Sequence, residues 1–183
     1  MSKRLAVILA DGFEEIEAVT VIDILRRAEL EVIICGLKAG MATGAHDLKI
    51  AVDMKLDDLK TNLDGIVLPG GMPGATHLAA SKKVKDIIVK MHSEGKIVAA
   101  ICASPAVVLA PTGILSGRKA TVYPGMEDGF GKDTIFSKDS VVVDGNIITS
   151  RAPGTALIFA LAIVKKLKGA KEAEEIGRKT LVS

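Results

Sequence analysis

The amino-acid sequence predicts an α/β protein, a three-layer α/β/α sandwich with a mainly parallel central sheet. Two observations support this prediction. Short runs rich in Val, Ile and Ala recur along the chain and are apolar throughout, as strands are when helices cover both faces of a parallel sheet. Longer amphipathic stretches separate these runs, and an alternation of strand and helix implies right-handed crossovers that place helices on both faces.

Four apolar runs are the predicted parallel strands: Leu5–Ala10, Val32–Cys35, Gly65–Leu68 and Ile97–Ile101. Three stretches between or after them are the predicted helices: Glu14–Ala28, Ser81–Glu94 and Pro105–Ala110. In the second half, an Asp-Gly-Asn turn lies between Val141–Val143 and Ile147–Thr149, a pattern typical of a β-hairpin. We expect a further helix from Pro153 through Val164 with a stop at Gly169, and a final surface helix at Lys171–Thr180.

Composition narrows the class of protein. The chain has 183 residues and a mass of 19.1 kDa, so residues 1–183 are predicted to form a single domain. A formal charge of +2 and an aromatic content of 3% give no reason to expect a nucleic-acid partner. The longest apolar run, Ala156–Val164, is far below the ~18 residues that cross a bilayer, and the N-terminus does not read as a signal peptide. We therefore expect a soluble, cytoplasmic protein with no membrane partner.

Cys102 is the candidate nucleophile. It follows the fourth predicted strand directly, and a helix is expected right after it, which is the arrangement of a nucleophile elbow with small neighbours such as Ala103 and Ser104. A thiol at a helix N-terminus would have its thiolate stabilised by the helix dipole and by free backbone N–H groups. The alternative is that Cys102 is a small core residue, as most free cysteines are.

The loop after the third strand, Leu68–Gly74, is a candidate oxyanion site. Gly70 and Gly71 would let backbone N–H groups approach a ligand closely. The alternative is a tight turn with no ligand. The loop is neither a P-loop nor a GxGxxG motif, because the residues that define those motifs are absent.

Glu17 lies within the apolar stripe of the first predicted helix, together with Val21 and Ile24. A carboxylate on a buried stripe must find a partner or take up a proton, since desolvation raises its pKa. The alternative is that Glu17 lies close enough to the helix start to reach solvent or to cap free N–H groups.

The remaining candidates carry weaker signals. None of the three histidines, His46, His77 and His92, lies near the end of an apolar strand in the sequence. Cys35 is expected to be a packed core thiol. Two cysteines are too few for a disulfide framework, and neither has a partner at zinc-binding spacing, so no metal site is predicted.

Four separated motifs, in this order, occur in one known family: Ile8–Ala10 with Gly12 and Glu14–Glu17, then Leu68–Gly71, Ala100–Pro105 and Ser150–Thr155. The chain closely resembles the ThiJ/PfpI superfamily of class I glutamine amidotransferase-like domains. Within it, the resemblance is to the branch of the Parkinson-associated protein deglycase and its bacterial homologues, and it runs from about Lys3 to Leu167. It implies a flavodoxin-like fold and a homodimer that needs no metal or organic cofactor.

The resemblance also implies roles for individual residues. Cys102 would be the nucleophile and oxidation-sensitive thiol, and Glu17 a carboxylic acid hydrogen-bonded to it. The backbone N–H groups of Gly71 and Ala103, beside Gly70, would form the oxyanion or sulfinate pocket.

Two positions depart from the patterns of relatives. Tyr123 stands where many relatives carry a histidine before a proline, which leaves the Cys102–Glu17 pair as the reactive unit. A phenol with a pKa near ~10 is a poor base at neutral pH but can donate a hydrogen bond. Ala103 replaces the histidine that follows the cysteine in the protease branch, so a peptidase is not expected.

The leading hypothesis is a glutathione-independent glyoxalase III or protein deglycase that acts on methylglyoxal, glyoxal or early glycation adducts. The rival hypothesis is a non-enzymatic oxidative-stress sensor or chaperone that uses oxidation of Cys102. The implied dimer would involve the first helix, which carries Ile16 and Val19 away from its apolar stripe.

Overall fold

The computed structural model describes residues 2–182, and its main sheet has seven strands. In spatial order these are β10 (Val141–Asp144), β11 (Ile147–Ser150), β7 (Ile97–Ile101), β6 (Gly65–Leu68), β1 (Arg4–Leu9), β2 (Glu31–Gly36) and β5 (Met54–Lys55). Every neighbouring pair is parallel except β10 and β11, which form an antiparallel hairpin. The predicted fold class, with its mainly parallel sheet, is confirmed.

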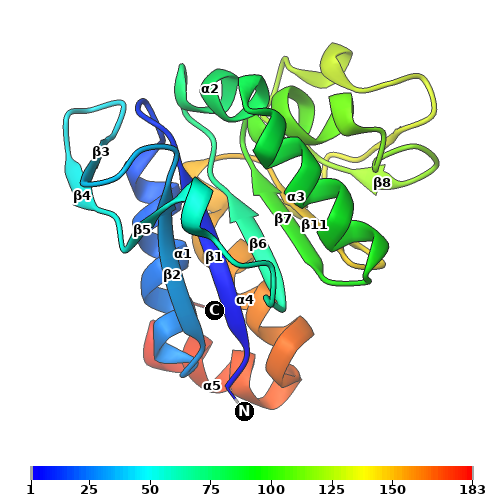
Figure 1. Cartoon of the computed structure of the whole chain (residues 1–183). Helices are drawn as coiled ribbons and strands as arrows, with labels where there is room; N and C mark the ends of the chain where they lie inside the picture. Colours follow the sequence, from blue (N-terminus) through cyan, green and yellow to red (C-terminus); the bar gives the residue numbers. More distant parts are fainter. Residues whose placement is uncertain (1, 183) are drawn as a thin grey trace.

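Helices cover both faces of this sheet (Figure 1). One face packs against α1 (Glu15–Arg27), α4 (Ala156–Lys168) and α5 (Ala170–Lys179). The other packs against α2 (Gly74–Ala80), α3 (Lys82–Ser93) and the π-helical turn η2 (Pro105–Leu109). Four short 3₁₀ turns complete the helical elements: η1 (Leu56–Asp58), η3 (Ala110–Thr112), η4 (Glu127–Gly129) and η5 (Pro153–Thr155).

Strand β1 shows why the predicted strands are apolar throughout. Leu5, Val7 and Leu9 enter the core under α1 and α4, while Ala6 and Ile8 enter the core under α2 and α3. Successive side chains of a strand point to opposite faces, so a strand between two helical layers needs apolar residues at every position.

The predicted helix at Pro105–Ala110 is not a regular α-helix. It forms the π-helical turn η2 and then the 3₁₀ turn η3, and the chain leaves η3 at Gly113, which has a φ of +80°. Pro111 lies within η3, and a proline has no N–H to donate and a ring that clashes with the preceding turn. These constraints account for the short, irregular helix.

Two small ribbons lie outside the main sheet and have no counterpart among the predicted strands. They pair β3 (Met41–Thr43) with β4 (Lys49–Ala51), and β8 (Lys119–Ala120) with β9 (Ile135–Phe136). The bridge between Phe13 and Gly44 ties the first ribbon to the loop that follows β1. This ribbon thus supports one side of the site described below.

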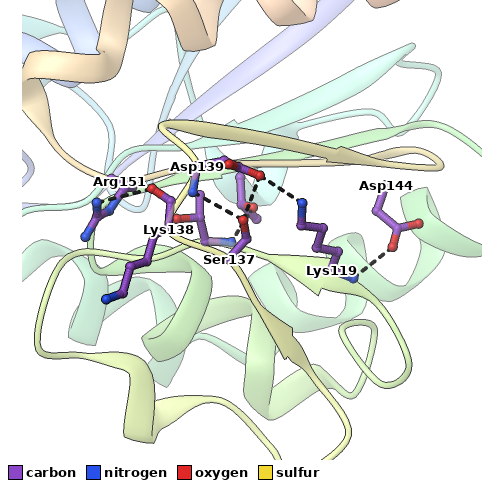
Figure 2. A network of polar contacts seen from close by, with 8 residues as sticks. Lys119, Ser137, Lys138, Asp139, Asp144 and Arg151 are labelled. Carbon is purple, nitrogen blue, oxygen red and sulfur yellow. Dashed lines mark hydrogen bonds and ion pairs between the residues drawn. The ribbon is translucent and has the colours of Figure 1, made fainter.

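Charged side chains hold the second ribbon against the β10–β11 hairpin, as Figure 2 shows. Asp139 Oδ2 lies 2.8 Å from Lys119 Nζ, and Asp144 Oδ2 accepts the Lys119 backbone N–H at 2.8 Å. Arg151, which directly follows β11, donates to the Lys138 carbonyl at 3.3 Å. The network therefore fixes the carboxyl end of β11, which borders the site.

Among residues 2–182, no helix combines the length and the apolar character that a bilayer span requires.

Candidate functional site

The site residues gather where β1, β6 and β7 end side by side. These parallel neighbours place the loops that follow them at one edge of the sheet. From β1 the chain crosses to β2, and from β6 it crosses in the opposite direction to β7, so the crevice lies between β1 and β6. Doubly wound sheets bind ligands at this kind of switch point.

Cys102 has the backbone conformation of an elbow, with a φ of +63°. A residue with a Cβ rarely adopts a positive φ, and such strain persists only where the surrounding structure imposes it. Here the Cys102 N–H donates to the Ser150 carbonyl at 3.0 Å, and its carbonyl accepts the Tyr123 N–H at 3.0 Å. The Ser104 hydroxyl, held behind the turn, donates to the Pro69 carbonyl at 2.6 Å. Cys102 is half-buried and packs against the edge of the core under α1 and α4, whereas Cys35 is buried.

Glu17 is completely buried, with 0% of its surface exposed. Its Oε2 atom accepts the Gly70 N–H at 2.7 Å. The alternative in which Glu17 reaches solvent is therefore wrong. Burial raises the pKa of Glu17 from 4.5 to about 7, although hydrogen bonds from Gly70 and Cys102 act in the opposite direction.

Gly70 lies between the two reactive side chains. A Cβ added at this position would be 2.6 Å from the Cys102 Cβ and 3.0 Å from Glu17 Oε2. The Cys102 thiol and the Glu17 carboxylate lie close enough for each to shift the pKa of the other, and among residues 2–182 Glu17 Oε1 has no hydrogen-bond partner. The structure thus brings together the thiol, the carboxylate and the Gly70–Gly71 loop, as predicted.

The pKa of Cys102 is raised, contrary to the expectation of a stabilised thiolate. Burial is the largest cause, and the neighbouring Glu17 charge adds to it. The backbone N–H groups of Gly71 and Ala103 act in the expected direction and lower the pKa, but they do not outweigh burial. Protonation of Glu17 removes the negative charge that raises the pKa of Cys102, so the titration of each group depends on the protonation state of the other.

Tyr123 lies beside the elbow through its backbone contact with Cys102, and its side chain remains 44% exposed. Tyr123 therefore lies next to Cys102, where the sequence predicted a neighbour of the site. A turn follows Tyr123, in which the Met126 N–H donates to the Tyr123 carbonyl at 3.1 Å.

His77 lies nearer to a strand end than the sequence indicated, and His46 lies beside the first turn of α1. His77 Nδ1 is 2.9 Å from the carbonyl of Asp11, two residues beyond β1. His46 Nδ1 is 2.8 Å from Glu15 Oε2, which lowers the pKa of Glu15 and raises that of His46. Sequence spacing could not show either contact, because each joins residues from different elements.

Glu14, Glu15 and His46 present potential metal ligands within 4.8 Å of one another, the one such group within residues 2–182. Both Glu15 oxygens already accept from His46, one from its backbone N–H at 2.5 Å and one from its ring. An ion pair therefore accounts for this arrangement. A Cβ added at Gly44 would overlap the Glu15 carboxylate, so a glycine at this position leaves room for the contact.

The chain is similar to known proteins over nearly all of its length. Residues 3–166 match the DJ-1/PfpI family. The chain is 41% identical over 186 residues to the protein dj-1beta of Drosophila melanogaster, covering 100% of this chain and 99% of that protein. It is 36% identical over 169 residues to a protein of Pyrococcus abyssi named as a deglycase, covering 90% of this chain and 99% of the relative.

Longer relatives and solved structures show the same likeness. The chain is 42% identical over 181 residues to the DJ-1 homolog B of Arabidopsis thaliana, covering 98% of this chain but only 41% of that protein's length. The structure of oxidized DJ-1 from Toxoplasma gondii has a TM-score of 0.95 at 35% identity, with 100% of both chains covered. With a family match over nearly all of its length and relatives aligned from end to end, the chain belongs to the DJ-1/PfpI family.

Proposed function

We propose that this protein is a cysteine-dependent glyoxalase III or deglycase that acts on 2-oxoaldehydes such as methylglyoxal and glyoxal, or on their early glycation adducts. One observation carries the proposal. A fully buried carboxylate, Glu17, lies close to the half-buried Cys102, and the backbone N–H groups of Gly71 and Ala103 offset part of the rise in the thiol pKa that burial causes. A nucleophile, a proton carrier and oxyanion donors thereby meet at one point.

The reaction begins at the aldehyde carbon of the substrate. The Cys102 sulfur forms a bond to this carbon while Glu17 takes the thiol proton, and the oxyanion that develops accepts hydrogen bonds from Gly71 and Ala103. The product of this step is a hemithioacetal.

Glu17 then moves a proton from the former aldehyde carbon to the adjacent ketone carbon. The first carbon is oxidised to a thioester and the second is reduced to an alcohol, so no external oxidant or reductant is required. Water breaks the carbon–sulfur bond, which releases a 2-hydroxy acid and restores the thiol. Methylglyoxal gives lactate by this route.

The raised pKa of Glu17 suits its carboxyl group to proton transfer at neutral pH. A carboxyl group whose pKa lies near 7 can both accept and donate a proton at neutral pH, whereas one at 4.5 is a poor acid there. Tyr123, whose backbone N–H donates to the Cys102 carbonyl, would add a phenol hydroxyl as a hydrogen-bond donor beside the elbow. The Pyrococcus relative named as a deglycase supports the same class of activity.

Lactate formation from methylglyoxal tests the proposal. We expect Cys102→Ser and Glu17→Gln each to lower kcat/KM at least ~100-fold, because each removes a group that acts in the chemical step. Cys35→Ala and Glu175→Gln serve as matched controls, since Cys35 is buried away from the site and Glu175 is a surface residue paired with Lys179. Equal rates in wild type and both site variants would exclude these residues from the mechanism.

A second candidate function is redox sensing at the same thiol. The N–H groups of Gly71 and Ala103 that would bind an oxyanion could equally hold the oxygens of a sulfinate, with protonated Glu17 as a further donor. The solved structure of DJ-1 from Toxoplasma gondii, which is described as oxidized, supports this alternative. Intact-mass measurement after mild peroxide, beside the lactate assay, separates the two functions. A protein that turns over methylglyoxal and resists oxidation is no sensor.

A further inference from the structure

A cavity lies at the carboxyl ends of β1 and β2, and its lining includes none of the residues assigned to the Cys102 site. It has a volume of about 290 Å³ and is bordered by α2 and by β3. Neither Cys102 nor Glu17 lines it. Doubly wound sheets bind small ligands beyond the carboxyl ends of their strands, so this location is suited to a ligand.

The volume limits what the cavity can hold. Ligand pockets commonly span ~300–1,000 Å³, and this cavity is at the lower end of that range. It has room for a small metabolite and none for a dinucleotide. Leu9, Leu37 and Ala42 form its apolar wall, against which a short aliphatic group can pack.

Two opposite charges lie at the rim of the cavity. Lys38 Nζ is 3.6 Å from Asp11 Oδ2, and the two side chains are 83% and 47% exposed. Such an open ion pair contributes little to stability, because water screens it. Asp11 Oδ1 also accepts the Thr43 N–H at 3.0 Å, which holds the carboxylate in place at the rim.

His77 adds an acceptor to this rim. Its Nδ1 atom lies 2.9 Å from the Asp11 carbonyl, and since a carbonyl can only accept, Nδ1 carries the hydrogen. The other ring nitrogen, Nε2, therefore has a free lone pair when the ring is neutral. At this small cavity the chain thus offers the cation of Lys38, the carboxylate of Asp11, the Nε2 atom of His77 as an acceptor, and an apolar wall.

We propose that this cavity binds a small zwitterion with an aliphatic group, of the class of a free α-amino acid about the size of leucine. The ligand carboxylate pairs with Lys38, and its ammonium group donates to Asp11 and His77. Its aliphatic group packs against the apolar wall. This binding does not depend on the activity proposed for Cys102, because the two sites share no residue.

Three matched ligands test the charge pattern. Leucine carries both charges, 4-methylpentanoate lacks only the ammonium group, and 3-methylbutylamine lacks only the carboxylate. In ¹H–¹⁵N NMR titrations we expect leucine to shift the amide signals of Leu37, Lys38 and Ala80, with a Kd on the order of millimolar. Each singly charged ligand should bind at least ~5-fold more weakly. No shift with leucine, or equal binding of all three ligands, overturns the proposal.

Two variants locate the binding. Lys38→Met should weaken leucine binding at least ~5-fold and leave 3-methylbutylamine unaffected, while Asp11→Asn should weaken both. The asparagine keeps an oxygen for the Thr43 N–H, and an unchanged thermal midpoint shows that each variant is folded. Lys49→Met, on the exposed β4 strand outside the cavity, is the control. Leucine affinity that is the same in wild type and in both cavity variants overturns the proposal.

Discussion

At the scale of single residues, Glu17 links the chemistry of the site to the stability of the fold. Its carboxyl group is fully buried. Among the described residues, its one hydrogen bond is from the Gly70 N–H to Oε2. Ionisation of such a group is opposed by desolvation. The burial that raises the pKa of Glu17 therefore makes its charged form destabilising to the folded state.

We predict that this cost appears as a pH dependence of stability. The pKa of Glu17 rises from 4.5 to about 7 on folding, so the folded protein binds the proton more tightly than the unfolded chain. The resulting stabilisation is complete below pH ~4.5 and is lost as the pH rises through ~7, for a total of about 3 kcal/mol. Glu17→Gln, whose amide oxygen can still accept the Gly70 N–H, should lack this loss.

Urea unfolding at about pH 5 and about pH 8 measures the effect. The free energy of unfolding of wild type, relative to that of Glu17→Gln, should fall between the two pH values. The comparison cancels groups that titrate equally in both proteins, His46 among them. A difference that stays constant with pH would show that Glu17 is ionised in the folded protein as readily as in the unfolded chain.

At the scale of elements, the loop between β6 and α2 sets the distance between thiol and carboxylate. We predict that Gly70→Ala lowers kcat/KM for methylglyoxal at least ~10-fold, because the new Cβ would meet Cys102 and Glu17 and force them apart. It should also lower the free energy of unfolding by about 1–3 kcal/mol through overpacking.

Gly131→Ala is the matched control for this substitution. A Cβ at Gly131 meets no atom within 4 Å, so the same chemical change is made in open space. Steady-state kinetics and denaturant unfolding of both variants check the prediction. Wild-type kinetics in Gly70→Ala would contradict the close packing of this loop against the reactive pair.

The elements differ in how far the sequence predicts them. Strands β1, β2, β6 and β7 lie within a residue or so of their predicted bounds, because a strand buried on both faces leaves a continuous apolar run. The β3–β4 ribbon has exposed and half-buried positions and leaves no such run. Its pairing depends on contacts with the loop after β1, which no local pattern encodes.

At the scale of the whole molecule, the first helix has a face that the described chain leaves uncovered. Ile16 is 56% exposed and Val19 is 45% exposed on α1, away from the stripe that packs on the sheet. We propose that this face packs against a second copy of the chain, because exposed apolar side chains on one helix face are typical of a protein interface.

Ile16→Glu should therefore weaken self-association at least ~10-fold, because it places a charge at the centre of an apolar contact. Sedimentation velocity at micromolar concentration measures this shift from dimer to monomer. Ile135→Glu is the matched control, since Ile135 is 59% exposed on β9, an element remote in sequence from α1. Monomeric wild-type protein would contradict the proposed dimer.

The sequence alone predicted the layers of this fold and singled out Cys102 and Glu17 as candidate site residues. Apolar runs, helical periodicity and the position of Cys102 after a strand are local signals, because burial on both faces constrains every residue of a strand. Only the tertiary structure decided how these parts meet. The contact of Glu17 with Cys102 across Gly70, the raised pKa of both groups and the cavity beside His77 arise between distant segments. Burial and charge at such meeting points depend on the whole fold, so no window of sequence contains them.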